Sequence, residues 1–276
     1  MNPSTPLPPT DYLALVVVVF LAGFTAVIIL TFLLHFFDAA GRRRIASVWV
    51  YLRAFAFEWW YSLAVVLAHP LGWLPRFGSW RYDPTGGPPI LLTHGFLMNR
   101  ACLFAVYWRL RRRGYRNVYP VNMWPPLGSI ETTGQRLAET IRAISAMAGG
   151  RELCCVAHSM GGVVLRWCVQ NDPALPVQKL VTIGSPHNGT RSAYLSPGAN
   201  AAQMRPDSTL LARLDAEPRV PLASIYSDLD NLVIPSESSA FGHVQLELPG
   251  CGHMTLMFDP RVFEWIAAEV PEMSAA

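Results

Sequence analysis

The sequence predicts an α/β domain, a mostly parallel sheet flanked by helices, with N-terminal apolar helices that meet a membrane. From residue 90 onward, short apolar runs alternate with longer amphipathic runs. This is the order of a parallel sheet that is covered by helices on both faces. Before residue 75 the chain instead contains two long apolar stretches, and 51% of its 276 residues are hydrophobic, which is high for a purely soluble domain.

Composition excludes several other classes of protein. The net charge is only +3, Lys179 is the single lysine, and no basic tract is interleaved with aromatic residues, so nucleic acid is not an expected partner. The five cysteines lack C-x-x-C spacing, which indicates neither a zinc site nor a disulfide framework. We expect them to be buried free thiols, with Cys154 and Cys155 on opposite faces of one strand.

The first apolar stretch, residues 12–37, predicts a transmembrane helix. It carries no charge until Asp38, and at about 1.5 Å per residue it is long enough to cross about 30 Å of hydrocarbon. A cleaved signal peptide is the competing interpretation, but no Lys or Arg precedes the run and the run is longer than an h-region. Three arginines at positions 42–44 follow it, so the positive-inside rule places the N-terminus outside and the arginines in the cytoplasm.

The second apolar stretch, residues 54–74, allows two arrangements. It contains Glu58, and its front carries Trp-Trp-Tyr at positions 59–61, which is typical of a membrane interface. If it crosses, the two stretches form a hairpin and the chain after Arg76 lies on the periplasmic side of a bacterial inner membrane. If it lies in the interface, the following domain stays in the cytoplasm. We favour the hairpin or a deep re-entrant segment, because a Glu near the end of a span costs less than one at its centre.

These features divide the chain into three regions. Residues 1–37 form the N-terminal transmembrane helix, residues 38–80 a basic loop with a second membrane-associated helix, and residues 81–276 the α/β domain. The Pro- and Gly-rich texture near residues 76–89 indicates the linker.

Local patterns predict the elements of the α/β domain in order. We expect strands at residues 90–93, 117–122, 152–156, 178–183, 222–226 and 244–248. We expect helices at residues 100–113, 129–147, 163–169, 208–214 and 260–270, with an irregular stretch at 185–205.

Residues 156–162, VAHSMGG, have the form of a nucleophile elbow. The motif small-x-Ser-x-Gly lies between a predicted strand and a predicted helix, the setting that such a sharp turn needs. The small residues Ala157 and Gly161 leave room for the crossing backbone. The Met160 N–H, at the positive end of the helix, would point toward an oxyanion formed at Ser159. The bare motif also occurs for turn geometry alone, so the interpretation depends on partners downstream.

Two candidate partners follow in the order Ser, Asp, His that is expected after such an elbow. An activated serine needs a base within hydrogen-bond reach and an acid to orient that base. His253 lies in a Gly-rich loop after one predicted strand, and Asp230 and Asp228 lie after another. We select Asp230 as the acid because the context Asp-x-x-Val-x-Pro places it at the mouth of its loop, whereas Asp228 could cap the turn. Singly, each is also an ordinary turn or surface residue.

Together, the motifs HGF, AHSMGG, TIGSPHNGT, D-x-x-V-x-P and G-x-G-H resemble those of bacterial lipases and esterases of the α/β-hydrolase fold. The resemblance spans about residues 88–270 and implies the α/β-hydrolase fold, a catalytic triad and no cofactor or metal. It carries over the backbone N–H groups of Phe96 and Met160 as an oxyanion hole. It also assigns His94 and Gly95 to the substrate-binding loop, where we expect His94 to position the loop rather than transfer protons.

Two departures limit what the resemblance implies. Ala157 replaces the Gly of the commonest elbow motif, and secreted lipases lack the N-terminal membrane region, so the chain is more similar to membrane-anchored esterases and phospholipases. Residues 186–215 resemble the lid-bearing insertion of lipases, although a static loop is equally compatible with this sequence.

The expected function is therefore a membrane-anchored serine carboxylic-ester hydrolase, a lipase or esterase that cleaves lipid-derived acyl esters through an acyl-enzyme on Ser159. The expected partners are the ester or lipid substrate and the bilayer, and homo-oligomer formation is left open. An acyltransferase with the same triad is one alternative. The other is a non-catalytic, membrane-tethered interaction module on a degenerate hydrolase scaffold.

Overall fold

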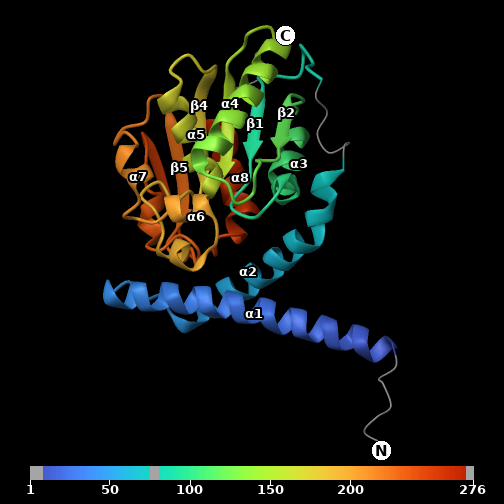
Figure 1. The fold of residues 1–276 in the computed structure, drawn as a ribbon, viewed down its shortest axis with the longest axis vertical. Helices are drawn as coiled ribbons and strands as arrows, with labels where there is room; N and C mark the ends of the chain where they lie inside the picture. The colour runs from blue at the N-terminus through green and yellow to red at the C-terminus, as the bar shows by residue number, and fades with distance from the viewer. Residues whose placement is uncertain (1–8, 75–80, 272–276) are drawn as a thin grey trace, which may run out of the picture.

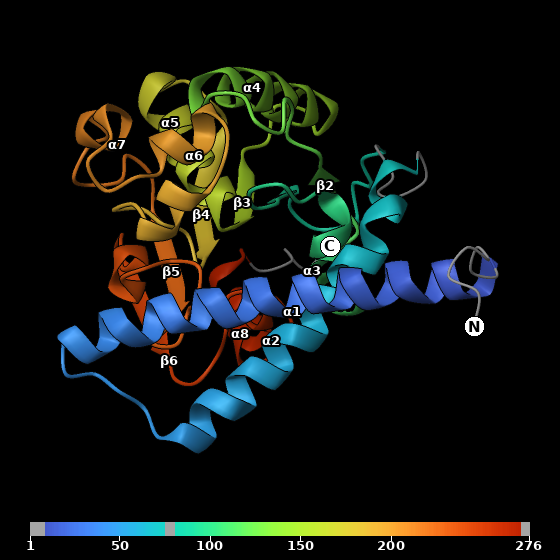
Figure 2. The same ribbon diagram turned by 60° about the horizontal axis from the view of Figure 1, so that its bottom comes forward.

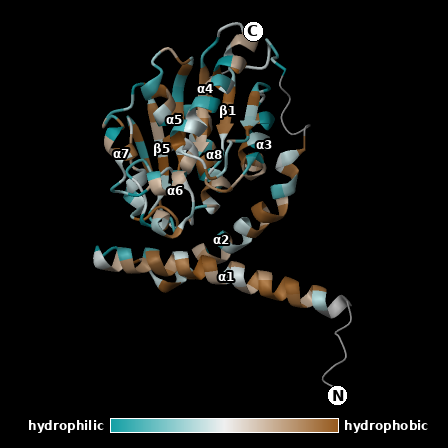
Figure 3. Ribbon diagram, viewed as in Figure 1, coloured by the Kyte–Doolittle hydropathy of each residue, from teal (hydrophilic) through white to brown (hydrophobic). Residues whose placement is uncertain are grey.

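The computed structural model describes residues 9–74 and 81–271 and places two long helices beneath an α/β body (Figure 1). Helix α1 spans Pro9–Gly41, and helix α2 spans Val48–Ala68 and continues as the 3-10 turn η1, His69–Trp73. Both are long and apolar enough to cross a membrane by length and composition, and the ribbon of α1 has the colour of hydrophobic residues over most of its length (Figure 3). Part of the predicted linker, residues 75–80, lies outside the described residues.

The body contains one six-stranded sheet in which all neighbouring strands are parallel, which confirms the predicted fold class. The strands are β1 Ile90–Thr93, β2 Val118–Val121, β3 Leu153–His158, β4 Val177–Ile183, β5 Leu222–Ser227 and β6 Val244–Leu248. They lie in the order β2-β1-β3-β4-β5-β6. Because all strands point the same way, every loop that follows a strand emerges at the same edge of the sheet.

Helices cover both faces of this sheet (Figure 1). They are α3 Phe104–Arg112, α4 Ile130–Met147, α5 Met160–Asn171, α6 Ala199–Gln203, α7 Thr209–Arg213 and α8 Pro260–Glu269. The predicted helix at 100–113 begins instead with a 3-10 turn, η2 Arg100–Leu103, where the Asn99 side chain accepts a hydrogen bond from the Ala101 N–H. The stretch at 185–205, expected to be irregular, contains η3 Arg191–Leu195 and α6.

Two hydrophobic cores lie on the two faces of the sheet. Cys155 belongs to the core beneath α4 and α5, and Cys154 belongs to the core beneath α3 and α8. This confirms that the two neighbours face opposite sides of β3. All five cysteines are buried and free, as expected.

Helix α2 packs against both α1 and the body. Its buried residues Ala54, Glu58 and Val65 recur at the spacing of one helical face, and that face is turned toward the body. Trp60 and Leu67 are 62% and 68% exposed. Figure 2 shows that α1 and α2 lie against the same end of the body.

The arginine tract after α1 also contacts the body. Arg42 and Arg44 both form ion pairs with Glu237, which follows β5 in the chain. Asp38, near the end of α1, pairs with Arg191 at 2.7 Å. The end of α1 and the loop after it are therefore attached to the same body that follows α2.

Candidate active site

Ser159 lies on a sharp turn between β3 and α5. Its φ of +53° is in a region that residues other than glycine rarely adopt, so the surrounding structure must hold it there. The Ser159 N–H donates to the Ile183 carbonyl at 2.9 Å. A Cβ at Gly161 would lie 2.6 Å from Thr93 Oγ1, and one at Gly162 would lie 2.3 Å from Ser185 Oγ. The two glycines therefore allow α5 to begin directly behind the serine.

His253 is held by Asp230. The Nδ1 atom of His253 lies 2.8 Å from Oδ2 and 3.0 Å from Oδ1 of Asp230, and both side chains are buried. Asp230 Oδ1 also accepts the N–H groups of Leu232 and Val233 at 2.9 and 2.8 Å, which fixes the carboxylate. Asp228 instead accepts the Gly250 N–H at 2.6 Å, a turn-capping contact away from the imidazole.

Ser159 and His253 line one cavity of about 100 Å³. Gly95 and Phe96 from the loop after β1 line it as well. The predicted insertion contributes further lining residues, which are Pro186, Thr190, Ser192, Ala193, Ser196 and Met204. The loops after β1, β3 and β6 thus meet around the serine, and the insertion covers them. Whether the insertion moves as a lid stays a prediction.

The charges around His253 favour its protonated form. Burial acts to lower the pKa of His253, but the charge and hydrogen bond of Asp230, with the charge of Glu58, outweigh it and raise the pKa above its ordinary value of 6.5. Such a ring accepts a proton readily, which is what a general base must do.

His158 is a neighbour of this ring that sequence reasoning did not single out. Its ring centroid lies 4.6 Å from that of His253, and it also lines the cavity. Burial, followed by the neighbouring His253, lowers the pKa of His158 well below its ordinary value. His158 is therefore a neutral ring that packs against the ring of His253. Its place before Ser159 in the elbow motif is the signal that could have found it.

Met160 and the loop that carries Phe96 both adjoin Ser159. Met160 is the first residue of α5, and the first N–H groups of a helix have no partner within that helix. Phe96 follows Gly95, where a Cβ would lie 2.9 Å from Ser159 Cβ and 3.4 Å from its Oγ. A side chain at position 95 would therefore crowd the serine. The assignment of the two N–H groups to an oxyanion stays a prediction.

His94 is engaged by backbone groups on both ring nitrogens. Nδ1 lies 2.9 Å from the Gly95 carbonyl, and Nε2 lies 2.9 Å from the Met123 nitrogen. Since the Met123 N–H can only donate, Nε2 accepts and Nδ1 carries the proton. Burial lowers the pKa of His94 to about 4. This neutral ring ties the Gly95 loop to the segment after β2.

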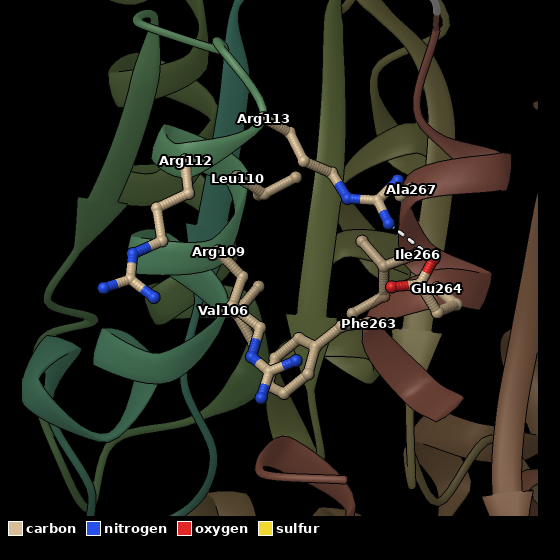
Figure 4. A pocket seen from close by; sticks show the side chains of 9 residues that line it. All are labelled: Val106, Arg109, Leu110, Arg112, Arg113, Phe263, Glu264, Ile266 and Ala267. Atoms are coloured by element: carbon tan, nitrogen blue, oxygen red, sulfur yellow. Dashed lines mark hydrogen bonds and ion pairs between the residues drawn. The ribbon is translucent and has the colours of Figure 1, made fainter. Parts of the chain in front are cut away.

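A larger cavity, of about 300 Å³, lies between α3 and α8, apart from Ser159 (Figure 4). Its arginines have partners in the protein: Arg109 lies 4.1 Å from the centroid of the Phe263 ring, and Arg113 pairs with Glu264. Arg112, also drawn in Figure 4, lies 5.6 Å from the Trp108 ring. Arg109, Arg112 and Arg113 are exposed, so they form a solvent-exposed helix face.

Comparison with known proteins supports the fold. No protein-family model matches the chain. Among solved structures, the chain is similar to Aspergillus fumigatus lipase B, with 18% identity and a TM-score of 0.59 over 69% of this chain and 53% of that chain. It is also similar to mature Bacillus licheniformis lipase BlEst2, with 16% identity and a TM-score of 0.58 over 68% of this chain and 93% of that chain.

A thermophilic esterase from Thermogutta terrifontis matches with 16% identity and a TM-score of 0.51, over 66% of this chain and 89% of that chain. The chain spans about half the length of the Aspergillus lipase. At these identities the likeness establishes the α/β-hydrolase fold, and what the chain does must be argued from its own residues.

Proposed function

We propose that this α/β-hydrolase fold carries a serine carboxylic-ester hydrolase, a lipase or esterase anchored to a membrane. The observation that supports it most is the meeting of two features in one cavity. One is a serine on a strained strand-to-helix turn, and the other is an imidazole whose Nδ1 is bound by a buried carboxylate. Together they supply the nucleophile, base and acid of acyl transfer.

In the proposed reaction, Ser159 Oγ attacks the ester carbonyl carbon and gives its proton to His253. Asp230 occupies Nδ1 of His253, which leaves Nε2 to receive that proton. The N–H groups of Phe96 and Met160 stabilise the tetrahedral oxyanion. His253 then protonates the leaving alcohol, and a water molecule releases the acyl group from Ser159 by the same route.

The expected substrates are lipid-derived acyl esters. We expect this class because the site is close to the proposed membrane region. It lies at the carboxyl ends of the strands, and α1 and α2 lie at the same end of the body (Figures 1 and 2). The similar structures named as lipases and an esterase agree with ester hydrolysis in general.

A direct experiment uses the full chain in detergent micelles. Hydrolysis of p-nitrophenyl butyrate is measured for the wild type, Ser159→Ala and His253→Ala, together with labelling by a fluorophosphonate probe and peptide mapping. We expect the label on Ser159 and a loss of at least about 10³-fold in kcat for both variants. Near-wild-type hydrolysis by either variant, or a label on another residue, contradicts the proposal. Acyl transfer to added alcohol that outpaces hydrolysis would indicate an acyltransferase instead.

For the membrane region, we propose that α1 is the anchor and that α2 lies in the interface. A crossing hairpin would put the arginine tract and the catalytic body on opposite sides of the membrane. The ion pairs of Arg42 and Arg44 with Glu237 favour the other arrangement, with both on one side. The positive-inside rule then places the body in the cytoplasm, in contrast to the periplasmic side that the sequence favours.

A further inference from the structure

Helix α2 lies along the loop that carries His253. At the start of the loop, a Cβ on Gly250 would lie 3.3 Å from the Arg53 guanidinium. At the end of the loop, the Tyr61 ring stacks on Phe258, with centroids 4.4 Å apart and planes 7° from parallel. Between these two contacts, α2 presents Glu58. Helix α2, which the sequence assigns to the membrane region, therefore packs along the histidine loop, residues 250–258.

Glu58 binds the backbone directly after the histidine. Its Oε1 accepts the Met254 N–H at 2.9 Å, and its Oε2 accepts both the N–H and the hydroxyl of Thr255, each at 2.9 Å. The residue is 1% exposed. Burial raises the pKa of Glu58, while the hydrogen bonds from Met254 and Thr255 and the charge of His253 act against that rise. All three partners donate to the carboxyl group, an arrangement that favours its ionised form, which only accepts.

Glu58 also fills the space beside Gly252, the residue that precedes His253. A Cβ on Gly252 would lie 2.4 Å from Glu58 Oε2, so the carboxylate touches the loop backbone both before and after His253. A buried charge is retained at such a place only when it is fully hydrogen-bonded. Glu58 therefore fits one conformation of the loop, the one in which His253 meets Asp230.

We propose that Glu58 is a positioning residue for His253, so that the membrane-proximal helix completes the active site. This inference rests on the proposed hydrolase function. Glu58 acts in two ways: it fixes the loop on both sides of the imidazole, and its negative charge stabilises the imidazolium that forms when Ser159 loses its proton.

Several titratable groups face the same ring and bear on the test. Asp230 comes from the loop after β5, His158 from the end of β3, and Glu58 from α2. From α1, buried His35 interacts electrostatically with Asp230. Because His158 is neutral, Asp230 and Glu58 supply the charges nearest the imidazole.

The experiment compares Glu58→Gln with Glu58→Asp in the full chain. Gln has the size of Glu but loses the charge and turns an amide donor toward the loop, whereas Asp keeps the charge on a shorter stem. Glu264→Gln, on the exposed face of α8, is the matched control. The readouts are kcat and KM for p-nitrophenyl butyrate, the pH dependence of kcat/KM, and the rate of Ser159 labelling by fluorophosphonate.

We expect Glu58→Gln to lower kcat and the labelling rate by about 10²-fold with little change in KM, since a small misplacement of the base has effects of this size. Without the charge, the pKa of His253 falls, so the acid limb of the pH profile moves to lower pH by about one pH unit. Glu58→Asp should keep the wild-type midpoint, and Glu264→Gln should match the wild type throughout.

A wild-type kcat and midpoint in Glu58→Gln, with an active wild type, overturn the inference and leave the hydrolase function standing. A wild type that neither hydrolyses the ester nor labels at Ser159 overturns the proposed function itself. If Glu58→Gln does not fold, Thr255→Val decides the question because it removes one of the three donors. We expect it to lower kcat about fivefold and Thr255→Ser to restore it. An unchanged kcat in Thr255→Val overturns the inference.

Discussion

Asn231 donates a hydrogen bond from its side-chain amide to the hydroxyl of Thr31 at 2.7 Å, although 200 residues separate them in the chain. The amide oxygen of Asn231 accepts the His253 N–H at 3.0 Å. Asn231 thus links helix α1 to the backbone of His253.

Thr31→Val removes the acceptor for Asn231 and should lower kcat about fivefold, the rate equivalent of one hydrogen bond of about 1 kcal/mol. The reason is that an unpartnered Asn231 holds the His253 backbone less firmly. Ester hydrolysis by the full chain in micelles measures the effect. Thr31→Ser keeps the hydroxyl and should restore the wild-type rate; equal losses in both variants would argue against this connection.

Asp230→Asn should lower kcat by about 10⁴-fold. The backbone N–H groups of Leu232 and Val233 keep the amide oxygen at the Oδ1 position, so the amide NH2 would donate to Nδ1 and the imidazole would take the wrong tautomer. Asp228→Asn is the matched control. It weakens the contacts of Asp228 with the Gly250 N–H and the Ser227 hydroxyl, so we expect a loss of about 1 kcal/mol in the free energy of unfolding and a kcat within about threefold of the wild type. Reversed effects would make Asp228 the acid. Steady-state kinetics and chemical denaturation separate the two.

Activity should fall on the acid side at a pH above the ordinary pKa of histidine. Asp230 and Glu58 raise the pKa of His253 above 6.5 despite its burial. The base must be neutral to accept the serine proton, so activity is lost as the pH falls through this raised pKa. The measurement is kcat/KM from pH 5 to 9, with the rate of fluorophosphonate labelling as an independent readout. A midpoint well below pH 6.5 in both the kcat/KM profile and the labelling profile would contradict a raised pKa of His253.

Gly161→Ala should destabilise the protein by about 1–3 kcal/mol and reduce labelling of Ser159. The added Cβ would lie 2.6 Å from Thr93 Oγ1 and 2.9 Å from the His94 carbonyl oxygen, so the elbow must shift. Chemical denaturation and probe labelling measure the two effects. Gly41→Ala, where no atom lies within 4 Å of the added Cβ, should change neither, and a Gly161→Ala protein as stable as this control would show that the turn has room to relax.

A reporter protein fused after Ala276 should show that the C-terminus lies in the cytoplasm. We propose that the body lies on the side of the arginine tract, since Arg42 and Arg44 pair with Glu237, and arginines that flank a span stay inside. We expect a fluorescent protein fusion to be bright and an alkaline phosphatase fusion to be inactive. The opposite pair of signals would restore the crossing hairpin.

The α/β body was largely predictable, because its signals are local. The apolar run of β1 ends at the same residues in sequence and structure, and the strand-to-helix turn at Ser159 is marked by its own small neighbours. The contact of Asp230 with His253 joins residues only 23 positions apart, each in the loop that follows a strand, so chain order suggested which side chains could meet.

The role of α2 was not predictable in this way. Glu58 is a single charged residue in an apolar run, and the sequence alone indicates only a membrane segment that tolerates one charge. Its partners are mostly backbone N–H groups 196 and 197 residues later, and backbone groups leave no trace in a sequence. The ion pairs of the arginine tract, which bear on the side of the membrane, likewise depend on tertiary contact with Glu237.

The close contact between Glu58 and Gly252 links the evolution of the two parts of the chain. If recombination joined this body to a different N-terminal region, the histidine loop would lose the Glu58 carboxylate. If position 252 then acquired a larger side chain, that side chain would clash with Glu58 of the original helix. The two parts should therefore travel together through evolution, and a substitution in either should be matched by one in the other.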